Sequence, residues 1–381
     1  MLQQIKQSNN IILWFAAAVV VFFALGVAIF SAPTHDYELY LRSWEVTIQG
    51  QNPWSVVTTN AYGPIHSALA LLYSIHFNLP RMLFVVLWLV CSFGISLLVH
   101  QNQAISQEWK YVFYLILFLN PLFWVFIVRF GTNDMLMAFF VLASIVLFIK
   151  QRDIPAGAFM ALAIGLKFIP IIMVPFLIYS RKRIRWRFAF SVLISLIIIF
   201  GVGYFLWGSN MRLPFQWAAE RHSKILSIYR FLRGEFSPLR IVVENPNLDG
   251  LSVYLSITAV SIFFLIHVMY RFDSFVSSII SLGLLLMFYK VGHHQFYITL
   301  ILLIMLWIGL EYEHIASANA TLTPFFIFTI WIAFVSFLYI LTDGYEGTNF
   351  REILGLPTFG FIGWMLWRII QCAWKQSIVR F

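Results

Sequence analysis

The sequence has few charged residues and almost no cysteine. Asp, Glu, Lys and Arg make up 11% of its 381 residues, whereas about a quarter of a soluble globular chain is charged. The two cysteines, Cys91 and Cys372, stand in apolar surroundings and indicate no disulfide framework. These shortages exclude a soluble enzyme, an intrinsically disordered chain and a disulfide-rich secreted domain.

Hydrophobic residues are correspondingly abundant. They make up 61% of the chain, and Phe alone supplies 40 residues. Long uncharged runs recur, and each is interpreted as a helix because backbone polar groups inside lipid must be bonded within their own segment. We therefore expect an all-α polytopic membrane protein, a bundle of about 10–12 transmembrane helices with both termini on the cytoplasmic side. The net charge of +9 is attributed to topology and anionic lipid, and no nucleic-acid partner is expected.

The first uncharged run, residues 11–34, is too long for a signal-peptide core and is expected to remain as a helix. Further runs of transmembrane or near-transmembrane length follow it along the chain. They cover residues 82–99, 111–128, 135–149, 188–211, 251–266, 274–289, 295–310, 321–342 and 353–367.

Lys167 divides one apolar stretch into two halves, residues 154–166 and 168–180. Each half rises only about 20 Å, which is short of a hydrocarbon core of ~30 Å. Basic residues at both ends of the stretch indicate the cytoplasmic side, so a broken pair of helices is favoured over one kinked span. Residues 64–77 are also short, and we expect them to form a re-entrant or surface-lying helix on the outer side.

The predicted outer loops hold most of the candidate functional residues. Asp36 and Glu38 follow the first run, and Arg129 and Asp134 precede the run that begins at residue 135. Asp134 either caps its helix or contributes to a site. The basic outer loop, residues 208–250, either lies on the membrane as an amphipathic helix or binds an anionic lipid or a phosphate-bearing substrate. The other candidates are Lys167, Arg221, His222, Lys224, Lys290, His293 and His294.

Three of these candidates carry a particular expectation. Lys167 lies at membrane depth, and because a buried ammonium is costly it is expected to face a cavity or an anion. The adjacent His293 and His294 have no carboxylate nearby in the sequence, so phosphate or sugar contact is favoured over metal binding. No cofactor is assigned, and a divalent metal is only weakly indicated.

Several short motifs follow one another in a definite order. They are His35-Asp36-Tyr37-Glu38, residues 50–54, Tyr62-Gly63-Pro64, Asn120-Pro121, Arg129-Phe130-Gly131-Thr132-Asn133-Asp134, and Lys167-Phe168-Ile169-Pro170 with the basic run after it. In this order they resemble the GT-C glycosyltransferases, which use polyprenyl-phosphate sugars, and most of all glycosyltransferase family 87. The resemblance covers roughly residues 10–190 of a single domain that spans residues 1–381, with further helices over residues 251–381.

The sequence departs from the family pattern at two places. Thr132 stands where the family has glutamine, and the acidic motif is Asp-x-Glu rather than Asp-x-Asp. The second departure weakens the analogy with metal-dependent relatives.

The resemblance implies an inverting hexosyltransferase in a bacterial inner membrane, with its active site facing the periplasm. It would move a sugar, mannose being favoured, from a polyprenyl phosphate to a lipid-linked or glycan acceptor. Asp36 is the predicted catalytic base. The predicted donor-phosphate residues are Glu38, Arg129, Asp134, Lys167, Arg221, His222, Lys224, Lys290, His293 and His294. A lipid-linked-sugar flippase and an enzyme like an O-antigen ligase or polymerase remain as alternatives.

Overall fold

The computed structural model describes residues 18–56, 61–180, 183–221, 223–238, 248–316 and 319–379. Within these ranges the chain is a helical bundle, and its only strands are β1 (Tyr179–Ser180) and β2 (Arg183–Ile184), which form one antiparallel hairpin. Seven helical segments of the described residues are long and apolar enough to cross a membrane. They are Leu79–Gln101, Gln107–Arg129, Trp186–Glu220, Gly250–Tyr270, His294–Tyr312, Leu322–Leu341 and Phe350–Lys375.

The predicted class, an all-α polytopic membrane protein, is confirmed. Shorter apolar helices complete the bundle, and one of them, Ala18–Phe30, is the described part of the first predicted run. Residues 11–17 of that run lie outside the described residues. The first part of the chain forms α2 (His35–Ile48), α3 (Pro53–Val56), α4 (Pro64–Ala68), α5 (Ala70–Tyr73), α6 (Leu79–Gln101), α7 (Gln107–Leu119), α8 (Pro121–Phe123), the π-helix η1 (Trp124–Arg129) and α9 (Asp134–Ile149).

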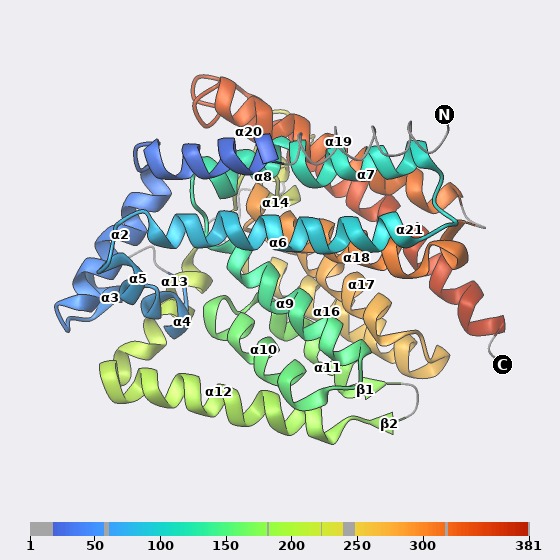
Figure 1. The fold of residues 1–381 in the computed structure, drawn as a ribbon, viewed down its shortest axis with the longest axis horizontal. Helices are drawn as coiled ribbons and strands as arrows, with labels where there is room; N and C mark the ends of the chain where they lie inside the picture. The colour runs from blue at the N-terminus through green and yellow to red at the C-terminus, as the bar shows by residue number, and fades with distance from the viewer. Residues whose placement is uncertain are drawn as a thin grey trace.

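The elements of the central part of the chain run from one end of the bundle to the other and back (Figure 1). In the figure, α2 to α5 and α13 lie at the left, and the β1–β2 hairpin lies at the right. These elements are α10 (Asp153–Leu166), η2 (Ile169–Met173), α11 (Val174–Ile178), α12 (Trp186–Trp207), η3 (Gly208–Arg212), α13 (Leu213–Glu220), α14 (Ile228–Arg233), α16 (Leu248–Tyr270) and α17 (Ser274–Phe288). The last part forms η4 (His294–Phe296), α18 (Tyr297–Ala316), α19 (Asn319–Leu341), α20 (Phe350–Ile353) and α21 (Gly355–Val379).

The predicted break at Lys167 is confirmed. Helix α10 ends at Leu166, and Lys167 itself has extended backbone angles of φ −142° and ψ 136°. The two halves begin and end at the same end of the bundle, because Asp153 at the start of α10 forms an ion pair of 2.6 Å with Arg185 beyond the hairpin. Lys167 therefore lies at the turn between two helical halves, at the end of the bundle opposite the β1–β2 hairpin.

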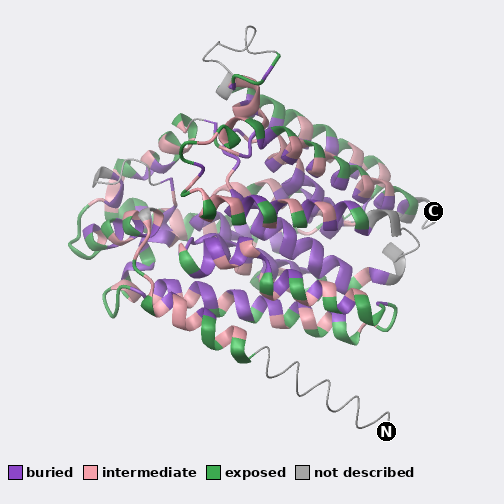
Figure 2. Ribbon diagram, turned by 90° about the horizontal axis from the view of Figure 1, so that it is seen from above, coloured by how far each residue is buried: buried purple, intermediate pink, exposed green. Residues whose placement is uncertain are grey.

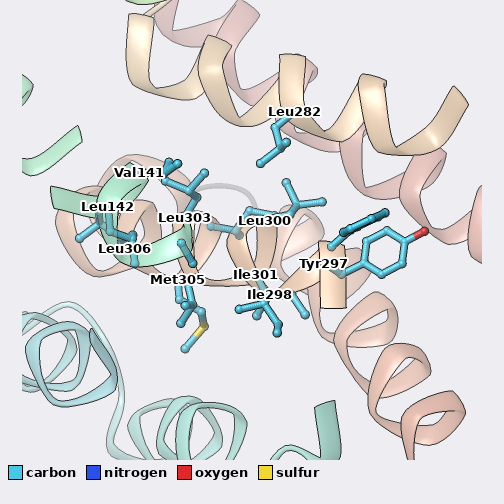
Figure 3. Close-up of a cluster of buried hydrophobic side chains, with 14 of the residues drawn as sticks. Val141, Leu142, Leu282, Tyr297, Ile298, Leu300, Ile301, Leu303, Met305 and Leu306 are labelled. Carbon is cyan, nitrogen blue, oxygen red and sulfur yellow. The ribbon is translucent and has the colours of Figure 1, made fainter. Parts of the chain in front are cut away.

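Buried residues concentrate in the interior helices of the bundle (Figure 2). The most central span is α18, in whose apolar window 89% of the residues are buried, against 17% for the span that includes α12. Side chains of α18 pack against Val141 and Leu142 of α9 and Leu282 of α17 (Figure 3). Helix α12 instead presents its apolar side chains at the surface, as lipid-facing helices do.

The basic loop after α12 packs onto the protein. Lys224 N–H donates to Lys290 C=O at 3.0 Å and Leu226 N–H donates to Gly292 C=O at 3.0 Å. Tyr229 of this loop is 2% exposed. The described part of the loop thus forms a wall against the α17–α18 connection.

Candidate active site

Elements distant in the sequence meet at one end of the bundle, which we call the site end. It is formed by α2, α4, the start of α9, the break after α10, the loop between α12 and α16, and the connection from α17 to η4. The opposite end, which carries β1 and β2, is called the hairpin end.

The centre of the site end is an ion pair between Asp134 and Lys167. Lys167 Nζ lies 2.7 Å from Asp134 Oδ1, and the two side chains are 6% and 0% exposed. The same ammonium group lies 4.9 Å from the ring centre of Tyr62 and 5.4 Å from that of Phe296. The sequence placed both Asp134 and Lys167 on the donor phosphate, and the structure pairs them with each other. This pair gives Lys167 the anion that its depth in the membrane requires.

A buried histidine lies beside this pair. His66 Nδ1 lies 3.0 Å from Asn133 Nδ2, and the backbone carbonyl of His66 accepts a bond of 2.8 Å from Trp44 Nε1. Burial, and then the positive charge of Lys167, lowers the pKa of His66 to about 3. His66 is therefore neutral and accepts a hydrogen bond from the Asn133 amide. Within the described residues, His66 Nε2 has no hydrogen-bond partner.

Two glycines allow the elements of the site end to approach one another. Gly63 N–H donates to the Leu166 carbonyl at 3.0 Å, and a Cβ at Gly63 would lie 2.2 Å from the carbonyl oxygen of Gly165. Gly131 has a φ of +59°, and a Cβ there would lie 2.9 Å from the Tyr37 ring. The glycines of these motifs thus allow the close packing of the backbone at the site end.

Asp36 lies in the first turn of α2, on the same helix face as Tyr40 one turn later. Burial raises the pKa of Tyr40 well above its usual value, and the charges of Tyr62, Asp36 and Asp134 add to this effect. Asp36 thus lies within electrostatic reach of the buried centre. Glu38 is exposed on the helix, so the two carboxylates of the acidic motif differ in their surroundings.

A basic cavity of about 320 Å³ lies at the same end of the bundle. Lys224 and Arg230 line it from the basic loop, His293 from the α17–η4 connection and Arg351 from α20. Burial, followed by the charges of His294, Lys224, Arg221 and Lys167, lowers the pKa of His293 well below its usual value. The remaining lining residues are Ser223, Ile225, Tyr339 and Gly344. Asp36 interacts electrostatically with Tyr339, which connects the carboxylate to this cavity.

Other predicted donor-phosphate residues lie in the walls or on the surface. Lys290 Nζ donates to Ala219 C=O at 2.6 Å, and His294 Nε2 lies 2.9 Å from the Tyr345 hydroxyl. Arg129 is exposed, with its guanidinium 5.9 Å from the Phe130 ring centre. Arg221 acts on His293 through its charge. His222 lies outside the described residues.

Sequence reasoning missed three residues of the site end. His66 and Arg351 were isolated polar residues in the sequence, and only the fold brings them to the centre and to the cavity. Arg81 is fully buried, lies 4.4 Å from the Tyr37 ring centre and donates to the Ser31 carbonyl at 2.9 Å. The signal in the sequence for Arg81 was an ionisable residue directly before a long apolar run. Among the described residues, no group of three or more His, Cys, Asp or Glu side chains could hold a metal ion.

The fold and the buried polar end define a multi-pass membrane protein with a site at one end of its helical bundle. The model of glycosyltransferase family 87 matches residues 60–289, more than half of the chain, and the chain therefore belongs to this family. The match includes His66, Asp134 and Lys167, and it begins after Asp36 and ends before His293. No curated protein matches the chain.

Proposed function

We propose that the chain is an inverting hexosyltransferase that takes its sugar from a polyprenyl phosphate and transfers it to a lipid-linked or glycan acceptor. Glycosyltransferase activity follows from the family. Mannose is the sugar that the sequence resemblance favours. The family favours this reaction over a flippase or other transporter.

One observation carries the proposal. Lys224, Arg230 and Arg351 line a cavity together with Tyr339, and the charge of the Asp36 carboxylate reaches Tyr339. Departure of a polyprenyl phosphate places negative charge on the leaving group, and cations fixed around that position stabilise the transition state. The acceptor hydroxyl is a weak nucleophile and needs a positioned base. The site end offers both groups.

In the proposed reaction, Asp36 accepts the proton of the acceptor hydroxyl while that oxygen attacks the anomeric carbon. The bond from the anomeric carbon to the phosphate oxygen breaks on the opposite face, so the configuration is inverted. Lys224, Arg230 and Arg351 bind the departing phosphate, and the neutral His293 donates a hydrogen bond. Lys167 adds to the positive electrostatic potential at the cavity, since its charge acts on His293.

We also propose that the site end faces the outside of a bacterial inner membrane. Arg183, Arg185 and Arg187 gather at the hairpin end, near Lys150 and Arg152. Basic residues next to transmembrane helices favour the cytoplasmic side. The acidic motif and the cavity then face the compartment in which lipid-linked sugars are used.

A transfer assay with radiolabelled polyprenyl-phosphate mannose in membranes tests the reaction. Asp36→Asn is expected to retain donor binding and to lose transfer by about 10²–10⁴-fold. Glu38→Gln is the matched control, because the second carboxylate of the same helix is exposed. Normal transfer by Asp36→Asn alongside loss in Asp134→Asn would show that the base is another residue. Movement of intact donor across vesicles without transfer would instead support a flippase.

A further inference from the structure

A cavity lies at the hairpin end, at the opposite end of the bundle from the candidate active site. Its volume is about 720 Å³. It is bounded by the end of α9, the β1–β2 hairpin, the start of α17 and the end of the apolar part of α18. Since α9 ends there, α17 begins there and the apolar part of α18 ends there, we infer that the cavity lies near the edge of the hydrocarbon layer.

Two arginines that line this cavity differ in their contacts. Arg185 forms the 2.6 Å ion pair with Asp153, donates to the Phe148 carbonyl at 3.2 Å and lies 4.0 Å from the Phe148 ring centre. Arg183 also lines the cavity, and it makes no hydrogen bond or ion pair with any residue that the structure describes. Among the described residues, Arg183 is thus available to an anionic group, and its cross-strand partner Ser180 lines the cavity beside it.

Two carboxylates line the same cavity on its other elements. Asp273 accepts hydrogen bonds from the first backbone amides of α17, at 2.9 Å from Phe275 N. Glu311 lies where α18 departs from helical angles, and one of its oxygens accepts a bond of 3.2 Å from Trp307 Nε1. The cavity therefore presents positive charge on one wall and negative charge on another.

The rim of the cavity is apolar and exposed. Ile149 and Leu310 line the cavity and are 45% and 40% exposed. Aliphatic side chains on the outer faces of a membrane bundle contact acyl chains. A ligand in the cavity can thus place a charged head between the hairpin and α18 and its apolar tails against the bundle.

We propose that this cavity binds one phospholipid whose head group carries both a phosphodiester and a primary ammonium. Arg183 and Ser180 bind the phosphodiester, which accepts charge-assisted hydrogen bonds from a guanidinium. Glu311 and Asp273 face the ammonium group. The lipid joins the hairpin to α17 and α18 and acts at the end of the bundle opposite the proposed transfer reaction.

Native mass spectrometry of the purified full-length protein tests the site, with phosphatidylethanolamine and phosphatidylglycerol as separate probes. The wild-type protein is expected to retain one phosphatidylethanolamine more tightly than phosphatidylglycerol. Arg183→Gln is expected to weaken this retention roughly tenfold, the value of one charged hydrogen bond. Arg187→Gln is the matched control. It also removes one arginine charge, four residues after Arg183, but Arg187 does not line the cavity.

Retention of the lipid is also expected to depend on its head group and on the cavity wall that carries Asp273 and Glu311. Glu311→Gln is expected to weaken retention of phosphatidylethanolamine and to leave that of phosphatidylglycerol unchanged. Equal retention of the two lipids by the wild type would overturn the assignment of the head group. Unchanged retention in Arg183→Gln, an equal loss in Arg187→Gln, or displacement of the lipid by inorganic phosphate alone would overturn the site.

Discussion

The two ends of the bundle use their charges differently. At the site end, Asp134 and Lys167 form a pair in which the side chains are 0% and 6% exposed. At the hairpin end, the pair of Asp153 and Arg185 has side chains 16% and 19% exposed. A buried pair is costly to assemble and costly to break, whereas a partly exposed pair contributes little. The comparison indicates that only the site end depends on its charges for the arrangement of its core.

The largest effect on stability is expected from breaking the buried pair. Lys167→Met leaves the Asp134 carboxylate buried without its cation and is expected to cost about 3–5 kcal/mol. The double variant Lys167→Met, Asp134→Leu removes both charges and should recover most of this loss. Thermal unfolding in detergent measures both variants. If Lys167→Met were as stable as the wild type, the site end would not depend on its buried ion pair more than the hairpin end depends on its partly exposed one.

A somewhat smaller effect is expected on turnover when a cation of the basic cavity is removed. Arg351→Ala is expected to lower transfer from a lipid-linked donor by about 10²–10³-fold, as removal of one oxyanion-hole donor does. Arg351→Lys should retain part of the activity, because it keeps the charge. Arg129→Ala, which removes an exposed cation outside the cavity, should transfer sugar normally. If Arg129→Ala and Arg351→Ala lose activity equally, the cavity is not the donor site.

The pH dependence of stability gives a third test of the site end. The pKa of His66 is about 3 in the folded chain, against 6.5 for a free histidine, so the unfolded chain binds the additional proton. The stability that a neutral His66 contributes is therefore fully present above pH 6.5 and falls as the pH decreases toward 3, by roughly 1.4 kcal/mol per pH unit. His66→Gln should reduce the pH dependence of stability between pH 7 and pH 5 by this contribution. His76→Gln, a change at an exposed histidine, should leave it unaltered.

The smallest effect is expected at the hairpin end. Asp153→Asn breaks the pair with Arg185, and because both side chains are partly exposed the cost should be about 1 kcal/mol or less. Thermal unfolding under the conditions used for Lys167→Met gives the direct comparison. A loss as large as that of Lys167→Met would show that the hairpin end, too, is organised by its charges.

Much of the bundle could be predicted from the sequence, because apolar runs in lipid must form helices. The break at Lys167 was also predictable. Lys167 and Pro170 divide an apolar stretch into two halves, and each half is too short to cross the hydrocarbon core. The partnership of Asp134 with Lys167 was not, because it depends on how α9 packs against the end of α10. Both residues were assigned to a ligand, since the sequence shows charges and does not show which of them neutralise each other.

The basic cavity shows the same limit of sequence reasoning. Lys224 and His293 were expected near a phosphate, and the structure places both in the cavity wall. Arg351 was missed because the turn between α19 and α20 brings it back from a distant part of the chain. Lys290 and His294 looked equivalent to His293 in the sequence, yet each has a hydrogen-bond partner within the wall. Only side-chain direction distinguishes them.

The backbone pairing of Lys224 and Leu226 with Lys290 and Gly292 joins two parts of the chain. It fastens the stretch that the family model matches to the connection just beyond the match, and the cavity wall is built from residues on both sides of that limit. The buried centre with Asp134 and Lys167 belongs entirely to the matched stretch, whereas Arg351 does not. Substitutions in the C-terminal helices can therefore reshape the wall of the cavity while the buried pair of Asp134 and Lys167 stays as it is.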